Sequence, residues 1–454
     1  MMNESGYAVA AWKGVLQLAP QFGDITYQII ISATRSSDGV WSPVQIIGTL
    51  DEDKFLTCGP KVAVNDLGLA VVMWEEKRDD SSTSFIMSSF LPFGGTWTTA
   101  VELDAPGIST DAIYTRGSIQ INNSGNVVAV WQLEIQGVSN DIVKASTYDP
   151  LTGTWTKVTL ATAIYSGFED EPEVAIDDNG NAVAIWNNYI YTSDGYLGQI
   201  ITSYFTYGSG WGTPEIIYNV LGSDAVGPYV VMDHLGTATA VWGGGVVDAG
   251  AYSSRLERGQ TWSAPELIGL GLFSPYANQE AVSVDEQGNV IVIVNDRYNG
   301  RNTYLRSILR TVQGGWQPPE DIFSDRRSNI DNPNIGLGSC GFALAFWQET
   351  NYMQGADNFG LANYILLAPS NFLGTRCCAK FATQSVCISS FSWDPAECAS
   401  IYYIRSNGVV IATIPAGGSL TFITTACTNA TNSYTLSYVN DFGIESPGVS
   451  VTLP

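Results

Sequence analysis

The sequence of 454 residues contains a single histidine, His234, and this scarcity excludes most hydrolytic machinery. Ser-His-Asp and Cys-His arrangements both need a histidine beside the nucleophile. His234 lies in a predicted turn, on the face opposite the longest loops. GxSxG, P-loop and HExxH motifs are absent from the sequence as well. The sequence therefore predicts no catalytic residue, no metal site and no cofactor.

Basic residues are also few, with 20 Lys and Arg against 44 Asp and Glu and a net charge of -24. Such an acidic surface repels phosphate backbones and anionic lipids, so nucleic acid and membrane-surface partners are disfavoured. No apolar run approaches the ~18 residues of a membrane span, so membrane insertion is not predicted.

What the sequence does contain is a tandem repeat marked by tryptophan. One series ends apolar runs such as AVAIW, and its first five members follow one another at gaps of 62, 57, 55 and 56 residues. A second series follows the first by about half a period. Counting the run VIVIV that ends at Val294, there are seven copies, which indicates a repeat architecture. The two series are Trp12, Trp74, Trp131, Trp186, Trp242 and Trp347, and Trp41, Trp97, Trp155, Trp211, Trp262 and Trp316.

Each repeat reads as four short antiparallel strands. In residues 171–186 two apolar runs flank a glycine-bearing turn, which is typical of a hairpin, and two further strands follow. Strands of nearly continuous Ala, Val and Ile have both faces covered, as in sheets stacked around an axis. Seven such units predict an all-β, seven-bladed β-propeller over residues 1–367. A linear solenoid would show polar capping units, which the sequence lacks.

The two ends of this ring are incomplete. The first strand of the first repeat is cut to a stub around Met1–Tyr7, and the seventh repeat lacks the tryptophan-bearing fourth strand. We therefore expect a further piece of chain upstream in the natural protein. A secretion signal would lie there, and none is visible in the given sequence.

Residues 368–454 differ in composition from the repeats. Five of the seven cysteines are concentrated here, namely Cys377, Cys378, Cys387, Cys398 and Cys427. This density predicts at least one disulfide and an oxidising compartment. Reduced thiols in the cytosol or a zinc site remain alternatives, although CxxC pairs are absent.

The order of elements in residues 368–454 resembles a fibronectin type III domain. The resemblance rests on Trp393 with Asp394-Pro395, on Tyr403 before the turn at Asn407-Gly408, on Tyr434 as the corner tyrosine, and on the closing segment 443–447. It implies a β-sandwich that folds separately from the repeats. The cysteine content departs from that family.

The repeats resemble those of large bacterial secreted and surface proteins and, more distantly, seven-bladed bacterial lectins. The similarity rests on GNAVAVW-like hairpins followed by a W-x-x-P-E-L-I strand. Two turns, at residues 36–41 and 257–262, are similar to the Asp-box of sialidases, which implies fold more than chemistry. A sialidase also needs an arginine cluster, and the first repeat offers only Arg35, on a different strand.

Loops that follow the hairpin tryptophans are long and rich in amides, acids and tyrosine. Such side chains on a rigid scaffold suit a sugar, because they offer planar polar groups and ring faces. Solvated loops without a ligand remain the alternative. The candidate ligand-binding residues in these loops are Glu75, Gln132, Asn187 and Gln348.

The sixth repeat alone replaces the hairpin tryptophan, by Val294. Loss of a bulky ring beside two arginines predicts a polar pocket for a carboxylate or a hydroxyl-rich ligand, with drift in one repeat as the alternative. The candidate residues there are Asn295, Asp296, Arg297, Tyr298 and Arg301.

Together these features predict a non-catalytic recognition protein, secreted or on a cell surface, that binds a glycan or a protein through the loop face. The main alternative is a carbohydrate-active enzyme, a glycoside hydrolase or lyase, on the same scaffold. With 44 carboxylates, a pair at a suitable separation is expected by chance. A protein-interaction scaffold is the third possibility.

Overall fold

The computed structural model is an all-β protein, and its described residues contain no helix. Two compact units are formed, the first by Met1–Ile335 and Trp347–Gly360, the second by Gly336–Phe346 and Leu361–Pro454. In parts of many strands only the backbone is described. The description covers residues 1–453 except 4, 18–25, 49–53, 56–58, 79–83, 105–111, 136–140, 165–171, 224, 246–249, 271–279, 299–301, 313, 326–327, 338–341, 352–355, 367–371, 382–383, 397–398, 427–431 and 440–444.

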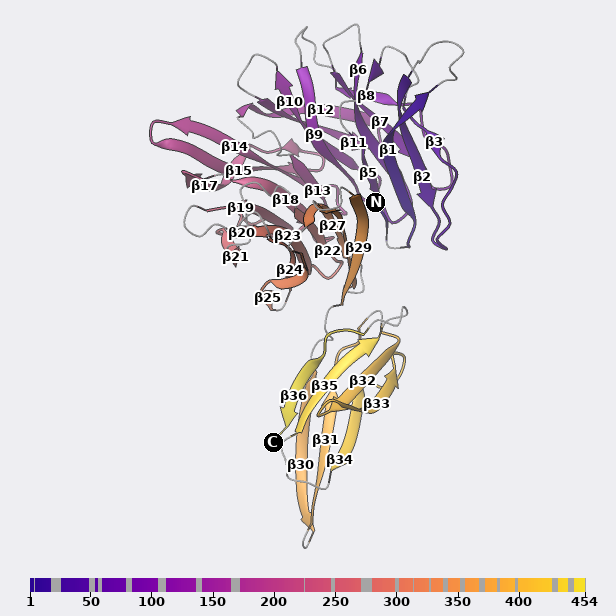
Figure 1. Cartoon of the computed structure of the whole chain (residues 1–454), viewed down its shortest axis with the longest axis vertical. Helices are drawn as coiled ribbons and strands as arrows, with labels where there is room; N and C mark the ends of the chain where they lie inside the picture. Colours follow the sequence, from indigo (N-terminus) through magenta and orange to yellow (C-terminus); the bar gives the residue numbers. More distant parts are fainter. Residues whose placement is uncertain are drawn as a thin grey trace. The chain divides into compact units, whose positions relative to one another are not determined.

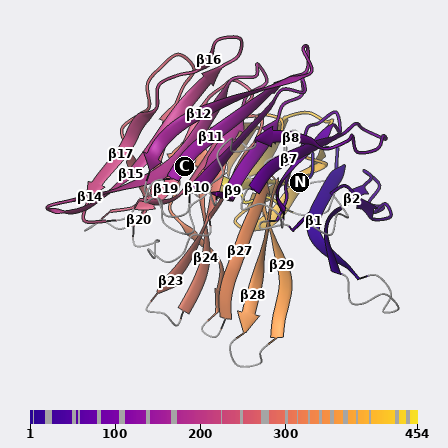
Figure 2. The ribbon, with the colours of Figure 1, turned by 90° about the horizontal axis from the view of Figure 1, so that it is seen from above.

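Seven antiparallel sheets follow one another along the chain, one for each sequence repeat, and are numbered here in that order (Figures 1 and 2). Sheet one contains β1 (Ala8–Gln17), β2 (Thr26–Arg35) and β3 (Gln45–Ile46). Sheet two contains β4 (Lys54–Phe55), β5 (Lys61–Val64), β6 (Ala70–Arg78), β7 (Ser84–Leu91) and β8 (Val101–Asp104). Sheet three contains β9 (Ala112–Ile121), β10 (Val127–Ile135), β11 (Asp141–Asp149) and β12 (Thr154–Ile164).

The next sheets repeat this plan. Sheet four contains β13 (Glu173–Ile176), β14 (Ala182–Thr192), β15 (Gly195–Thr206), β16 (Gly210–Trp211) and β17 (Glu215–Leu221). Sheet five contains β18 (Val226–Met232), β19 (Ala238–Gly244), β20 (Gly250–Leu256) and β21 (Glu266–Leu270). Sheet six contains β22 (Glu280–Val284), β23 (Val290–Tyr298), β24 (Asn302–Thr311), β25 (Gly315–Trp316) and β26 (Glu320–Asp325), and sheet seven β27 (Ser328–Leu337), β28 (Phe342–Asn351) and β29 (Ala356–Leu366).

The early strands of successive sheets lie against one another. Strands β5, β9, β13, β18 and β22 form a continuous series of neighbours of this kind. Within these sheets the strands pair largely in the order of the chain. In sheet three, for example, β10, β11 and β12 follow β9 in this order. This is the arrangement of blades in a propeller, as the repeats predicted. A ring of seven blades stays a prediction.

Tryptophans of the first series fill the space between a sheet and the one before it in the chain. Trp131 packs with Met73 of sheet two, and Trp186 packs with Val130 of sheet three. Trp12 of sheet one instead is 37% exposed. The buried members of the series are therefore packing residues, and they are Trp74, Trp131, Trp186, Trp242 and Trp347.

A five-residue turn joins two strands within a sheet and also contacts the turn of the next sheet. In the turn from Asn122 to Asn126, Gly125 has a φ of 84°, a left-handed conformation that glycine adopts without strain. Asn122 Oδ1 accepts a hydrogen bond from Asn126 N at 2.9 Å, and Asn122 Nδ2 donates to the carbonyl of Asp177 at 3.0 Å. Asn65 Nδ2 likewise donates to the carbonyl of Asn122 at 2.9 Å. Buried amides thus connect sheets two, three and four.

In sheets four, five and six an aspartate takes the place of the turn asparagine, as Asp177, Asp233 and Asp285. Asp285 accepts hydrogen bonds from both the backbone and the side-chain nitrogen of Asn289 at 2.8 Å. Burial raises the pKa of Asp285, although these hydrogen bonds act to lower it. An ionised aspartate can hold its own turn but cannot donate to the next one. His234 lies exposed in the turn of sheet five, as predicted.

Within the second unit, residues 372–453 form two sheets that share one core. Its largest buried side chains include Trp393, Tyr402 and Tyr434, and Tyr402 Oη accepts a hydrogen bond from Ala396 N at 2.6 Å. One sheet contains β30 (Leu373–Phe381), β31 (Gln384–Ser392) and β34 (Thr421–Ala426). The other contains β33 (Val409–Pro415), β32 (Ile401–Ser406), β35 (Asn432–Val439) and β36 (Val449–Leu453). Its membership of the fibronectin type III class stays a prediction.

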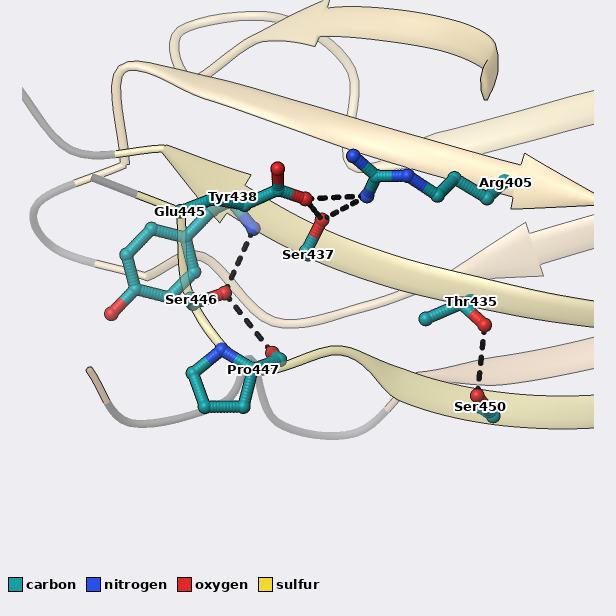
Figure 3. A network of polar contacts seen from close by, with 8 residues as sticks. All are labelled: Arg405, Thr435, Ser437, Tyr438, Glu445, Ser446, Pro447 and Ser450. Carbon is teal, nitrogen blue, oxygen red and sulfur yellow. Dashed lines mark hydrogen bonds and ion pairs between the residues drawn. The ribbon is translucent and has the colours of Figure 1, made fainter. Parts of the chain in front are cut away.

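A polar network holds the segment after β35 (Figure 3). Arg405 Nη1 lies 2.5 Å from Glu445 Oε1 and donates to Ser437 Oγ at 2.7 Å. Burial acts to raise the pKa of Glu445, but hydrogen bonds from Arg405 and Ser437 hold this pKa below its usual value. Ser446 Oγ accepts a hydrogen bond from Tyr438 N at 3.0 Å (Figure 3). The chain is therefore anchored at Glu445 and Ser446, ahead of β36.

Cysteine chemistry in this unit is described at one position. Cys387 on β31 is fully buried and disulfide-bonded, and Cys378 lies opposite it in the register of β30 and β31. The cysteine to which Cys387 is joined has a side chain outside the described residues.

No helix in the described part of the chain is long and apolar enough to cross a membrane.

We expect thiol titration of the denatured, unreduced protein to find fewer than the seven thiols that the sequence contains. A disulfide among the five clustered cysteines should stabilise the second unit by roughly 2 to 4 kcal/mol, because it restricts the unfolded chain. The same titration after reduction is the control and should find all seven. Seven thiols before reduction would contradict the prediction of an oxidising compartment.

Candidate functional site

The residues predicted as loop ligands lie at one repeated position, directly after the tryptophan of the hairpin. Glu75, Gln132 and Asn187 are buried there, because β6, β10 and β14 continue past the tryptophan. Gln132 Nε2 donates to Asp141 Oδ2 at 2.6 Å, and Asn187 Nδ2 donates to the Tyr189 hydroxyl at 3.2 Å. These amides bond within their own sheets. A role for them in ligand binding stays a prediction.

The predicted residues of the later repeats are described only in part. Asn295, Asp296, Arg297 and Tyr298 belong to β23 and pair with β24, and their side chains lie outside the described residues. Gln348 belongs to β28, again with the backbone alone described, and Arg301 falls outside the description altogether.

At Val294 the structure shows packed core. Its side chain is buried with Val292 and Ile308 of sheet six and with Val241 and Ala251 of sheet five. The volume of the absent tryptophan is thus taken up locally by apolar side chains.

A cavity of about 350 Å³ lies at the other end of the same strands, between sheets five and six. This volume is at the lower end of the ~300 to 1,000 Å³ of small-ligand sites. Its position is next to the turns that join the third and fourth strands, away from the predicted loop face. The lining residues are Ser253, Ser254, Arg255, Glu257, Gln260, Thr261, Ser263, Glu266, Arg310, Gly315 and Trp316.

Comparison of the repeats shows why a cavity exists here. Tyr148 in sheet three and Phe205 in sheet four lie opposite the tryptophans of the second series, Trp155 and Trp211. The ring centroids are 5.2 Å and 5.3 Å apart, so aromatic packing closes the space. The equivalent residue of sheet six, opposite its own tryptophan, is Arg310.

A second aromatic residue, on the neighbouring sheet, is also replaced by arginine. Phe90 of sheet two contacts Tyr148 and Trp155 across the interface, with centroid distances of 4.7 Å and 6.0 Å. The position of Phe90, one residue before the end of the third strand, is Arg255 in sheet five. Two of the three rings that close the interface of sheets two and three are therefore arginines at the interface of sheets five and six.

Trp316 keeps the place of the third ring. It is half-buried, packs on the core between sheets five and six, and also lines the cavity. An indole in this setting offers an apolar ring face to a ligand.

Several polar groups around the cavity have no hydrogen-bond partner among the described residues. Ser253 is 2% exposed, and its Oγ has no hydrogen-bond partner among the described residues. The same holds for Arg255 Nε and Arg310 Nη1, both of which are buried atoms. Burial and, after it, the charge of Arg255 lower the pKa of Arg310, while Glu266 and Glu257 act in the opposite direction. The Arg310 guanidinium nevertheless stays charged, as arginine does in proteins.

The cavity is poorly equipped for histidine or metal chemistry. The only histidine is His234, which does not line it. Among the described residues, no group of three or more His, Cys, Asp or Glu side chains could hold a metal ion. What the lining offers is hydrogen-bond donors, two exposed carboxylates and a ring face.

Sequence reasoning did not select Arg255, Arg310 or Trp316. In the sequence, Trp316 is only one member of the second tryptophan series, and the turn before Trp262 is similar to an Asp-box. A signal was nevertheless present: aligning the third strands of the repeats places an arginine where Tyr148 and Phe205 stand.

No protein-family model matches the chain, and neither does any curated protein. Among solved structures, it is similar to the BP39L lectin from Burkholderia pseudomallei, with a TM-score of 0.44, 12% identity, and coverage of 78% of this chain and 98% of the lectin. It is similar to the Hadza microbial sialidase Hz136, with a TM-score of 0.39, 13% identity, and coverage of 86% and 88%. For an alpha-L-arabinanase of Penicillium chrysogenum, the values are 0.38, 12%, 67% and 92%. Similarity at this level assigns no function.

Proposed function

We propose that the protein is a non-catalytic recognition protein that binds a glycan in the cavity between sheets five and six. The observation that carries this proposal is the exchange of two packing side chains for Arg255 and Arg310 beside Trp316. A sugar presents hydroxyl groups along its rim and C–H groups on its face. Guanidinium, carboxylate and hydroxyl groups form hydrogen bonds with the sugar hydroxyls, and an indole ring packs on the C–H face.

Energetics favour a binding role over a packing role for these arginines. An apolar side chain at the position of Arg310 would contribute about 1.5 to 3 kcal/mol by burial. A buried donor without an acceptor instead costs about 1 to 3 kcal/mol, and more when it is charged. The chain therefore gives up packing stability at this interface, as binding sites commonly do.

A carbohydrate-active enzyme is the second candidate, and one observation favours it. Glu257 and Glu266 both line the cavity and are exposed. Two carboxylates that flank a sugar are the groups that glycoside hydrolysis requires. Product analysis of any bound oligosaccharide separates the two candidates, because a recognition protein returns its ligand intact.

The proposal extends to the predicted architecture and location. We expect residues 1–367 to close into a seven-bladed ring and residues 368–454 to form a fibronectin type III-like module, in a protein that is secreted or held on a cell surface. Ligand recognition by the loop face, above all by Arg297 and Tyr298, is a separate prediction. The proposal that the cavity binds a glycan does not depend on it.

A glycan-array screen tests the proposed function and should identify at least one bound oligosaccharide. Trp316→Ala should then weaken binding by about 1 to 3 kcal/mol, the range for loss of an anchoring side chain. Trp41→Ala is the matched control, since Trp41 holds the equivalent place in sheet one and does not line the cavity. Calorimetric titration with the oligosaccharide measures both variants, and circular dichroism verifies their fold. An array without a bound glycan, or equal losses in the two variants, would contradict the proposal.

A further inference from the structure

The two arginines of the cavity lack an ion-pair partner among the described residues, in contrast to three other cations of the chain. Lys144 and Arg306 each lie 2.6 Å from an aspartate oxygen, and Arg405 lies 2.5 Å from Glu445. Arg255 and Arg310 form no ion pair with any described residue, although Glu257 and Glu266 line the same cavity. The carboxylates are thus near enough to act on the charge of Arg310 but do not neutralise it by contact.

This arrangement is unusual for so acidic a chain. With 44 acidic and only 20 basic residues, an arginine has many possible partners, and two unpaired arginines at one cavity are unexpected by composition. Like charges placed side by side repel, and the repulsion is stronger where water is partly excluded. An anion between the two guanidinium groups would relieve that repulsion and accept hydrogen bonds from both.

Resting on the proposed glycan function, we infer that the ligand is acidic: the cavity selects a sugar residue whose carboxylate lies between Arg255 and Arg310. A carboxylate matches the planar fork of a guanidinium, which binds both of its oxygens at once. Trp316 supplies the ring face beside it, and the buried hydroxyl of Ser253 can bond a ligand oxygen. A neutral sugar would leave both cations uncompensated.

The repeats themselves supply variants that remove charge and preserve packing. Arg310→Leu copies the residue of sheet five, Leu256, which holds the equivalent place at the end of the third strand. Arg255→Phe copies Phe90 of sheet two. Arg35→Leu is the matched control, because Arg35 also holds the place of Arg310, in sheet one, and does not line the cavity.

The experiment compares matched oligosaccharides that differ at one sugar: carboxylated, neutral with the carboxylate reduced to an alcohol, and neutral with a sulfate added. Calorimetric titration at two salt concentrations gives the affinities. We expect the carboxylated form to bind at least about 10-fold more tightly than the reduced form, with the difference shrinking at high salt. Arg310→Leu and Arg255→Phe should each weaken its binding by about 10- to 100-fold, and Arg35→Leu by less than about 2-fold.

The outcomes separate this inference from the proposed function. Equal affinity for the carboxylated and reduced forms overturns the acidic ligand but leaves glycan recognition standing. Tighter binding of the sulfated form overturns the assignment of a carboxylate. Absence of binding to all three forms and to every other glycan overturns the proposed function itself. Loss of binding in Arg35→Leu equal to that in Arg310→Leu overturns the location.

Discussion

Replacing Trp186 with alanine should lower the free energy of unfolding by about 3 to 5 kcal/mol. The side chain is 1% exposed and lies among apolar residues of sheets three and four, including Val130 and Val174. Its loss removes buried apolar surface and leaves a cavity that the surrounding strands cannot fully collapse into, since hydrogen bonds fix them on both sides. Chemical denaturation followed by circular dichroism measures the change.

Two further variants give this prediction its controls. Trp41→Ala should cost less than about 1 kcal/mol, because Trp41 is 51% exposed. Trp186→Phe should cost clearly less than Trp186→Ala, since phenylalanine keeps most of the ring and removes an indole N–H that has no hydrogen-bond partner among the described residues. A loss below about 1 kcal/mol in Trp186→Ala would show that the tryptophans of this series do not hold the sheets together.

Replacing Asn122 with leucine should lower the free energy of unfolding by about 2 to 4 kcal/mol, from two lost hydrogen bonds in a buried turn. Leucine leaves the backbone N–H of Asn126 without the acceptor that now lies 2.9 Å away. It also leaves the carbonyl of Asp177, in the next sheet, without its side-chain donor at 3.0 Å. Both groups are buried, so water compensates them poorly.

Asn122→Asp separates the two contributions. Asp177 shows that an aspartate can hold such a turn, because its Oδ1 accepts a hydrogen bond from Asn181 N at 2.8 Å. The aspartate variant should therefore keep the turn of sheet three and lose only the donor to sheet four, at roughly half the cost of Asn122→Leu. Equal losses in the two variants would mean that the connection between sheets accounts for the whole effect. No measurable loss in either would contradict the prediction.

The repeat could be predicted from the sequence because each unit carries its own local signals. Gly125 marks a turn that needs a left-handed residue, and the apolar run before Trp131 marks a strand covered on both faces. Such signals depend on neighbours close in the chain, so they survive without tertiary information. Exposure of Trp12 did not follow from them, because it depends on whether another sheet lies against that face.

The candidate site could not be predicted in the same way. Arg255 and Arg310 are 55 residues apart in the chain and belong to different repeats, so no local pattern joins them. Strand length could not be predicted either. Gln132 and Asn187 directly follow a tryptophan, where the sequence predicts a loop. In the structure β10 and β14 continue past the tryptophan, so both residues are buried in a sheet.

The sequence by itself determined the all-β class, the period of the repeat and the positions of its turns and packing tryptophans, because periodic apolar runs and glycine turns act over a few residues. Only the tertiary structure decided where packing is incomplete. That property depends on which side chains from two neighbouring sheets face one another across an interface. At sheets two and three the facing side chains are Phe90 and Tyr148, which fill the space, and at sheets five and six they are Arg255 and Arg310, which leave a cavity between two unpaired charges.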